Sequence, residues 1–221
     1  MSRAGYEISD VIPPAEPRTP ATKPATTSKM TFATEITTPT TLPHEQSQNL
    51  RGDSTRHTLE VPKNANVSIR ELSLEESQLI RDARRPATGW ALDFPTDGDV
   101  RVAAYYAGIP PAPTPEPWTS LWLIVESDLV VGMLGFKGEP LANQLEVGYG
   151  IAPSVRGRGV TTQALAQLLD LIKHRGLKVR AETAVWNIPS QSVLRHLHFK
   201  EVGRRNDPGD GDLIVWELFG D

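Results

Sequence analysis

The residues best suited to chemistry form one short segment, Arg156-Gly-Arg-Gly-Val-Thr-Thr162, between an expected strand and an expected helix. Glycines let the backbone turn tightly and direct several N–H groups toward one anion. The positive end of the helix dipole and two arginines add to that attraction. The segment lacks the Lys-Ser/Thr ending of a Walker loop, and Thr162 stands where a dinucleotide fingerprint has its third glycine. The sequence therefore predicts a site for a phosphate-bearing ligand, with a plain glycine turn and helix cap as the alternative.

Metal and thiol chemistry find little support in the sequence. The chain has no cysteine, which excludes disulfides, thiol nucleophiles and thiolate metal ligands and suits a reducing compartment. His196 and His198 lie two residues apart near an expected helix end, without a carboxylate cluster to complete a metal site. We therefore expect no bound metal.

The glycine segment lies between an expected strand and an expected helix, and each has a regular apolar pattern. Residues 144–151 alternate in polarity, which is typical of a half-buried strand. Gly176 is expected to end the following helix as its C-cap. The apolar stripe of that helix consists of Leu165, Leu168, Leu169 and Ile172.

The remaining elements predict the fold class. A helix is expected after Ser73, because Glu76 follows at the capping-box spacing, and a short helix is expected around Pro189. Residues 102–106 have a helical pattern, and prolines make residues 108–117 an extended loop. This order predicts an α/β (α+β) fold with a single mixed, mostly antiparallel sheet flanked by helices. The other expected strands are residues 67–70, 120–126, 129–136, 179–185, 199–202 and 213–219.

With these elements in place, the sequence resembles the GNAT superfamily of N-acetyltransferases, in particular the branch that includes ribosomal-protein N-terminal acetyltransferases. Arg156-x-x-Gly159-x-Thr161 matches the family's Gln/Arg-x-x-Gly-x-Gly/Ala loop at two of three fixed positions, and Thr161 departs from it. The segment 187–199, Asn-Ile-Pro-Ser-Gln-Ser-Val-Leu-Arg-His-Leu-His-Phe, resembles the family's Asn-x-x-Ser/Ala…Leu-x-Phe block, and residues 146–151 resemble its central strand. Leu194 occupies the position of a tyrosine general acid found in other branches, so that group is absent here.

The resemblance implies a GNAT-like acyl-CoA N-acyltransferase fold in which a primary amine attacks acetyl-CoA directly within a ternary complex. The Ile151 backbone would pair with the pantetheine arm, the loop amides would hold the pyrophosphate, and Asn187 would order the cofactor arm. An N–H near the end of strand 146–151 would stabilise the developing oxyanion. The expected cofactor-binding residues are Ile151, Arg156, Gly157, Arg158, Gly159, Val160, Thr161, Thr162 and Asn187.

The same mechanism needs a proton acceptor, because an amine with a pKa of about 10 is mostly protonated at neutral pH. Family members use a glutamate at the position of Glu146 or of Glu182, and either residue could instead be a solvated surface carboxylate. A base acting through water is a further option. Ser190 could donate a proton to the departing thiolate or bind the pantetheine arm, or it could simply cap the short helix. Glu146, Glu182 and Ser190 are therefore the expected catalytic residues.

Net charge and apolar content indicate which classes of binding partner the sequence favours. The chain of 221 residues has a formal net charge of −4, which gives no reason to expect nucleic acid. Its start lacks the apolar core of a secretory signal, and no stretch approaches the roughly 18 apolar residues of a membrane span. We therefore expect a cytoplasmic protein without membrane contact. The sequence leaves the oligomeric state open, with a homodimer as one option.

The chain divides into a tail and one domain. Between Val11 and Glu45, ten of 35 residues are threonine and seven are proline, so residues 1–65 are predicted to form a disordered Thr/Pro-rich tail. Residues 66–221 are predicted to form the N-acetyltransferase (GNAT-like) domain. Its acceptor is expected to be either a small-molecule amine or a protein or peptide N-terminus. A catalytically inactive CoA-binding or regulatory module of the same fold is the alternative, and a generic nucleotide-binding protein is a third option.

Overall fold

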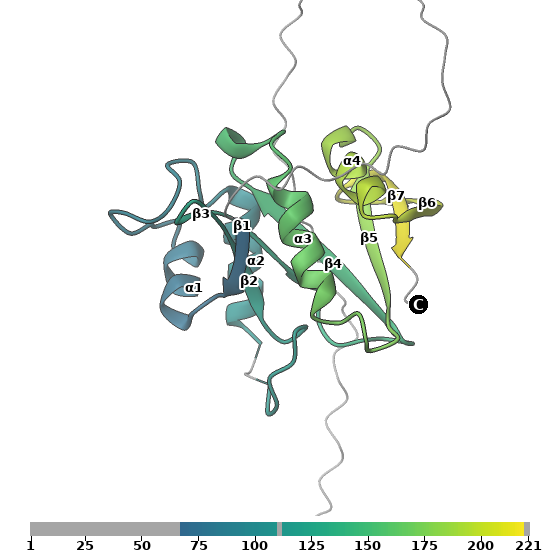
Figure 1. The fold of residues 1–221 in the computed structure, drawn as a ribbon, viewed down its shortest axis with the longest axis horizontal. Helices are drawn as coiled ribbons and strands as arrows, with labels where there is room; N and C mark the ends of the chain where they lie inside the picture. Colours follow the sequence, from purple (N-terminus) through teal and green to yellow (C-terminus); the bar gives the residue numbers. More distant parts are fainter. Residues whose placement is uncertain (1–66, 110–111, 219–221) are drawn as a thin grey trace, which may run out of the picture.

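The chain folds around one seven-stranded sheet, which a computed structural model describes for residues 67–109 and 112–218 (Figure 1). The strand order is β1-β2-β3-β4-β5-β7-β6, and every neighbouring pair is antiparallel except β4 and β5. The expected single mixed, mostly antiparallel sheet is therefore confirmed. The strands are β1 (Val67–Glu71), β2 (Leu121–Glu126), β3 (Leu129–Phe136), β4 (Gln144–Ile151), β5 (Lys178–Ala184), β6 (Lys200–Asp207) and β7 (Gly211–Leu218).

Capping boxes mark the starts of the first two helices. Ser73 and Glu76 form the expected capping box at the start of α1. A second capping box, formed by Thr96 and Asp99, starts α2 five residues before the stretch with the helical pattern. The helices are α1 (Leu74–Arg81), α2 (Asp97–Ala107), the short 3₁₀ helix η1 (Pro153–Val155), α3 (Val160–Asp170) and α4 (Ile188–His196).

The cap of α2 places a carboxylate inside the protein. The Thr96 backbone N–H and hydroxyl both donate to Asp99 Oδ2, at 2.9 and 2.7 Å. Asp99 Oδ1 is buried and has no hydrogen-bond partner among the described residues. Burial raises the pKa of Asp99 to about 6, although the hydrogen bonds from Thr96 oppose the rise.

A tight turn and a close strand contact fix the centre of the sheet. Ser127 and Asp128 join β2 to β3 with φ values of 48° and 67°, which is the backbone of a two-residue hairpin turn. Gly132 of β3 lies so close to β4 that an added Cβ would be 2.5 Å from the Gly150 carbonyl oxygen. A side chain at Gly132 would therefore push β4 away from β3 just before the glycine loop.

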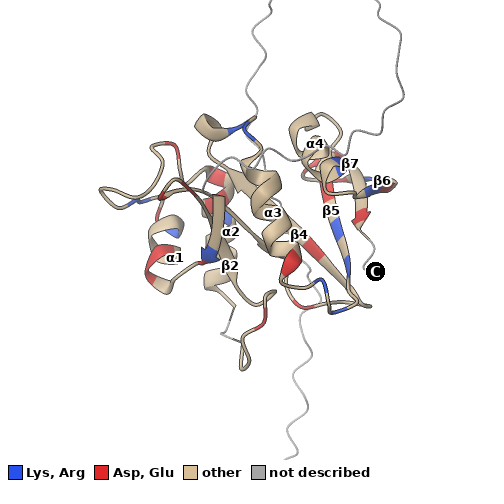
Figure 2. Ribbon diagram, viewed as in Figure 1, with Lys and Arg blue, Asp and Glu red and all other residues tan. Residues whose placement is uncertain are grey.

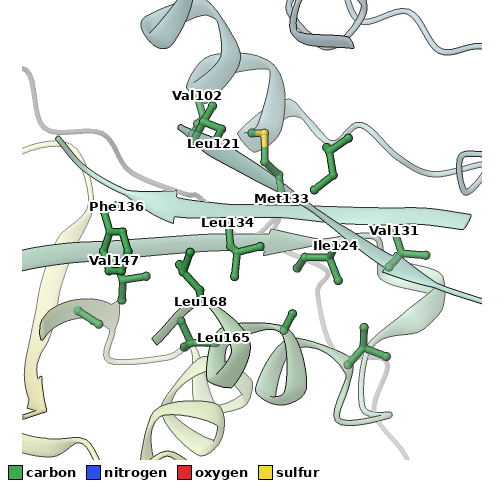
Figure 3. Close-up of a cluster of buried hydrophobic side chains, with 14 of the residues drawn as sticks. Val102, Leu121, Ile124, Val131, Met133, Leu134, Phe136, Val147, Leu165 and Leu168 are labelled. Carbon is green, nitrogen blue, oxygen red and sulfur yellow. The ribbon is translucent and has the colours of Figure 1, made fainter. Parts of the chain in front are cut away.

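Helices cover both faces of the sheet (Figures 1 and 3). Figure 3 shows Met133 directed toward Val102 of α2, whereas Leu134, the next residue of β3, points to the opposite side, where α3 lies. We call these the α2 face and the α3 face. The strand register extends this alternation across the sheet, since opposite residues share a face. The α3 face is lined by buried residues that include Leu134, Phe136, Val147, Leu165 and Leu168.

Several predicted boundaries are wrong, for local reasons. The predicted C-cap Gly176 does not end α3, which already stops at Asp170, because the amides of Leu171 and Ile172 bond three residues back and tighten the chain into turns. Gly176 nevertheless has the left-handed φ of 62°. Strand β6 continues five residues beyond the predicted end at residue 202, because it pairs with β7 as far as Asp207.

Some predictions fall outside the described residues. They are the disordered tail at residues 1–65, Pro110 and Pro111 of the predicted proline loop, and Phe219 at the end of the last predicted strand. Within the described part of the chain, no helix combines the length and apolar character needed to cross a membrane.

Candidate active site

The predicted phosphate-binding loop joins η1 to α3. Gly157 and Gly159 both adopt left-handed φ values, 76° and 75°, and Gly159 is the N-cap of α3. The first turn of a helix leaves its backbone N–H groups without intrahelical partners, and no side chain caps them here. A Cβ added at either glycine would meet no atom within 4 Å, so the space around the loop is open. The loop thus presents amides at the positive end of a helix to a space that an anion can enter.

The two arginines of this loop have different surroundings. Arg156 is half-buried, and its Nε is buried without a hydrogen-bond partner among the described residues. A phosphate oxygen would provide the acceptor that this group lacks. Arg158 is instead tied to Glu126 at the end of β2 by an ion pair of 2.6 Å. Of the two, Arg156 is therefore the better phosphate ligand, and Arg158 would first have to leave Glu126.

The threonines that follow the loop differ in exposure. Thr162 is buried at 8% relative exposure, whereas Thr161 is only half-buried. The Thr162 side chain therefore offers little surface to an anion. Val160 is buried and anchors the first turn of α3.

Strands β4 and β5 pair only at their beginnings. The parallel ladder between them covers Gln144–Glu146 opposite 178–180. On the other side of β4, the Lys137 N–H donates to the Glu146 carbonyl and the Ala152 N–H donates to Val131. The backbone N–H and C=O groups of even-numbered β4 residues therefore point toward β3. Those of Val147, Tyr149 and Ile151 point to the other side, where β5 diverges. The predicted pairing of Ile151 with an extended ligand fits this unpaired edge.

Helix α4 begins beside this edge. The Asn187 side chain is the N-cap, and its Oδ1 accepts the Ser190 N–H at 3.2 Å. The Tyr149 hydroxyl donates to the Ser190 carbonyl at 3.3 Å, and burial raises the pKa of Tyr149 above its usual value. Tyr149 therefore links β4 to α4 as a neutral phenol. Leu194, at the position of the absent tyrosine acid, is fully buried.

The two candidate bases lie on one face of the sheet. Glu146 is opposite Arg180 in the register, and Glu182 follows Arg180 by two residues, so all three point to the α2 face. Figure 2 marks the acidic and basic residues along β4 and β5. The Lys137 Nζ donates to Glu146 Oε1 at 2.6 Å, and both side chains are partly exposed. Glu146 is therefore an accessible carboxylate with one cationic partner.

Glu182 is held more firmly. Arg180 donates to it at 2.8 Å, and Arg205 of β6 donates to both of its oxygens, at 2.8 and 2.5 Å. Only 7% of the Glu182 side chain is exposed. Burial acts to raise its pKa, but the hydrogen bonds and charges of Arg205 and Arg180 outweigh burial and lower the pKa to about 2. Such a carboxylate is a weak proton acceptor at neutral pH.

Several residues around the site were missed from the sequence. Arg180 could have been found, because it shares a strand face with Glu182 at the i, i+2 spacing. Arg205 and Lys137 carry no such signal, because each reaches its glutamate from another strand or a following turn. Among the described residues, no group of three or more His, Cys, Asp or Glu side chains could hold a metal ion.

The mixed sheet, whose parallel strands β4 and β5 part beside the N-terminus of α3, is the fold that the resemblance to the N-acetyltransferase family predicts. The chain belongs to the GNAT acetyltransferase family, since the family model "Acetyltransferase (GNAT) domain" matches residues 67–200. The protein is an acetyl-CoA-dependent N-acetyltransferase that transfers an acetyl group to an amine. The expected fold, family and acyl donor are thereby confirmed, and no observation favours the inactive module.

Comparison with solved structures shows the same fold. RimL, a ribosomal L7/L12 alpha-N-protein acetyltransferase in complex with coenzyme A, matches with a TM-score of 0.52 at 20% identity, covering 72% of this chain and 97% of that chain. RimJ of Mycobacterium smegmatis in complex with CoA-disulfide matches with 0.50 at 21% identity, covering 69% and 81%. A ribosomal-protein-S5-alanine acetyltransferase from Vibrio fischeri matches with 0.50 at 17% identity, covering 70% and 93%. No curated protein sequence matches the chain.

Proposed function

We propose that the acceptor of this acetyltransferase is the α-amino group of a protein or peptide N-terminus. The main observation behind this proposal is that both candidate bases are ion-paired. Glu146 pairs with Lys137, and Glu182 pairs with two arginines that lower its pKa to about 2. Carboxylates held by cations are weak bases, and a weak base suits an amine that loses its proton easily. An α-amino group has a pKa of about 7.7–8.0, against about 10.4 for a lysine side chain. Near neutral pH about a tenth of α-amino groups are already neutral, against fewer than about one in a thousand lysine amines.

The names of two similar solved structures support this acceptor. One is named as a ribosomal L7/L12 alpha-N-protein acetyltransferase and the other as a ribosomal-protein-S5-alanine acetyltransferase. A small-molecule amine of low pKa would satisfy the same chemical argument, so it stays the alternative acceptor. We also propose that residues 66–221 form one catalytic domain and that the protein acts in the cytoplasm. The proposal leaves a homodimer open.

In this proposal Glu146 takes the proton of the acceptor, directly or through one water molecule. It is the more exposed of the two glutamates, and a single lysine leaves part of its carboxylate free to accept. Glu182 has a structural task instead: it holds Arg180 and Arg205 in place along the same face. Acetyl-CoA supplies the activated thioester, and the departing sulfur takes up a proton, for which Ser190 is the proposed donor. This assignment of roles rests on the ion pairs of the two glutamates.

The cofactor would be held by the glycine loop and the unpaired edge of β4. The amides of residues 157–162 and the Arg156 guanidinium would bind the pyrophosphate, and the Ile151 backbone would pair with the pantetheine arm. Asn187 would order that arm indirectly, because its side chain caps α4. A backbone N–H at the end of β4 would stabilise the oxyanion.

Matched peptides test the acceptor. One peptide carries a free N-terminus and no lysine, and its partner carries an acetylated N-terminus and one internal lysine. We expect CoA release with the first peptide only, and a rate that rises with pH as an amine with a pKa of about 8 loses its proton. Polyamines and aminosugars are assayed in parallel. Turnover of these small amines or of the lysine peptide, with none on the free N-terminus, would overturn the proposal.

A further inference from the structure

Asp93 lies outside the site described above but accepts hydrogen bonds from η1, the short helix that precedes the glycine loop. The Ser154 N–H donates to Asp93 Oδ2 at 2.7 Å, and the Ser154 hydroxyl donates to Asp93 Oδ1 at 2.8 Å, across 61 residues of sequence. Ser154 is the middle residue of η1, two positions before Arg156. The N-cap residue of η1, Ala152, has no side chain that can accept. Asp93 therefore supplies, from a distant segment, the acceptor that the start of η1 lacks.

The segment that carries Asp93 is fixed on both sides. Trp90 and Phe94 are buried at 7% and 1% exposure and contact each other edge to face, with ring centroids 5.2 Å apart. The Ala91 N–H donates to the Val130 carbonyl at 2.8 Å, which aligns the segment with the start of β3. Two aromatic anchors and a backbone bond thus hold Asp93 in place against η1.

Charge connects Asp93 to the loop as well. Burial acts to raise the pKa of Asp93, but the hydrogen bonds from Ser154 and the charge of Arg156 outweigh burial and lower the pKa below its usual value. The carboxylate is therefore ionised at neutral pH and attracts the Arg156 guanidinium. The Nε of Arg156 stays unpaired among the described residues, so this attraction does not use up its capacity to donate to an anion.

We propose that Asp93 is a positioning residue for cofactor binding, which fixes η1 and Arg156 so that the pyrophosphate-binding loop is formed before CoA arrives. This inference rests on the proposed function, in which that loop holds the pyrophosphate. A preorganised loop loses less conformational freedom when the ligand binds. Because Asp93 acts through the loop, its removal weakens cofactor binding and leaves kcat at saturating acetyl-CoA nearly unchanged.

Calorimetric titration with CoA tests the proposal on the full chain. Asp93→Ala removes two hydrogen bonds to a charged group and is expected to raise the Kd for CoA by about tenfold or more. Asp93→Asn keeps an oxygen that can accept from Ser154 but loses the charge toward Arg156, so its Kd is expected to fall in between. Ser154→Ala keeps the backbone bond, and we expect a rise of only about threefold. Asp97→Ala is the control, since Asp97 is a nearby aspartate that is exposed and lies in the first turn of α2.

Steady-state kinetics separates positioning from general stability. In Asp93→Ala, the KM for acetyl-CoA should rise while kcat and the KM for the acceptor peptide stay within about twofold. A CoA Kd within twofold of the wild type, or a loss of kcat with unchanged CoA affinity, would overturn the role of Asp93. If Asp93→Ala fails to fold, Asp93→Asn and Ser154→Ala decide by the same criteria. A wild-type protein that does not bind CoA would overturn the loop's proposed function, and with it this role.

Discussion

Replacing Glu182 with glutamine tests whether this carboxylate is structural rather than catalytic. The change removes the negative charge between Arg180 and Arg205 and keeps the shape of the side chain. A pKa lowered from 4.5 to about 2 corresponds to on the order of 3 kcal/mol, at about 1.4 kcal/mol per pKa unit. The arginine side chains are 29% and 23% exposed, and solvent screening reduces this value. We therefore expect Glu182→Gln to lower the free energy of unfolding by about 2 kcal/mol near pH 7, or Tm by about 4–8 °C.

Urea unfolding at several pH values provides the assay. Because the folded-state pKa of Glu182 lies below its unfolded value, its stabilisation is fully present above pH 4.5 and is lost as the pH falls toward about 2. The difference between wild type and Glu182→Gln should therefore shrink between pH 5 and pH 3. Glu201→Gln is the matched control, because its ion pair with Arg204 is largely exposed and should contribute less than about 0.5 kcal/mol at any pH.

Two results would refute this reasoning. Equal stability of Glu182→Gln and wild type near pH 7 would show that the two arginines do not depend on this carboxylate. A fall in kcat of about a thousandfold without loss of stability would identify Glu182 as the base instead.

Three further predictions concern other residues. Glu146→Gln should lower kcat for peptide acetylation by about 10²–10⁴-fold, while its CoA affinity stays near that of the wild type; unchanged kcat would exclude Glu146 as the base. Gly159→Val should abolish CoA binding in calorimetry and lower Tm, because a β-branched residue is strained at a φ of 75°; wild-type affinity would contradict the loop assignment. Asp99 has a folded-state pKa of about 6, above its unfolded value of 3.8, so its contribution to stability falls as the pH rises from 3.8 to 6. Asp99→Asn should flatten that part of the stability curve in urea unfolding, and an unchanged curve would contradict the burial argument.

Local patterns predicted the parts of the fold that local rules govern. The capping box at Ser73 and the alternation of residues 144–151 each depend on neighbours within a few positions. The glycine loop belongs to the same class, because its φ values and the following helix are encoded within seven residues. The family resemblance then supplied the GNAT-like fold class, whereas the order of the strands in the sheet comes from the structure.

Long-range contacts account for what the sequence did not predict. Strand β6 is rich in charged residues, and its length follows from pairing with β7 rather than from any apolar alternation. Glu182 was expected to act as a base or as a solvated carboxylate, and nothing local indicates that Arg205, 23 residues away, would hold it. The bond between Asp93 and Ser154 is a similar case. Such contacts depend on which strands and loops become neighbours in the fold. Local sequence patterns carry no information on those neighbours.

The most direct test of the central claim is a calorimetric titration of the protein with acetyl-CoA, CoA, ATP and NAD, alongside Gly159→Trp. We predict saturable binding of acetyl-CoA and CoA, no binding of NAD, and loss of CoA binding in the variant, whose indole would occupy the space around the loop. Absence of binding of either CoA form to folded wild-type protein, or equal binding of both to Gly159→Trp, would contradict the assignment of this loop as the cofactor site.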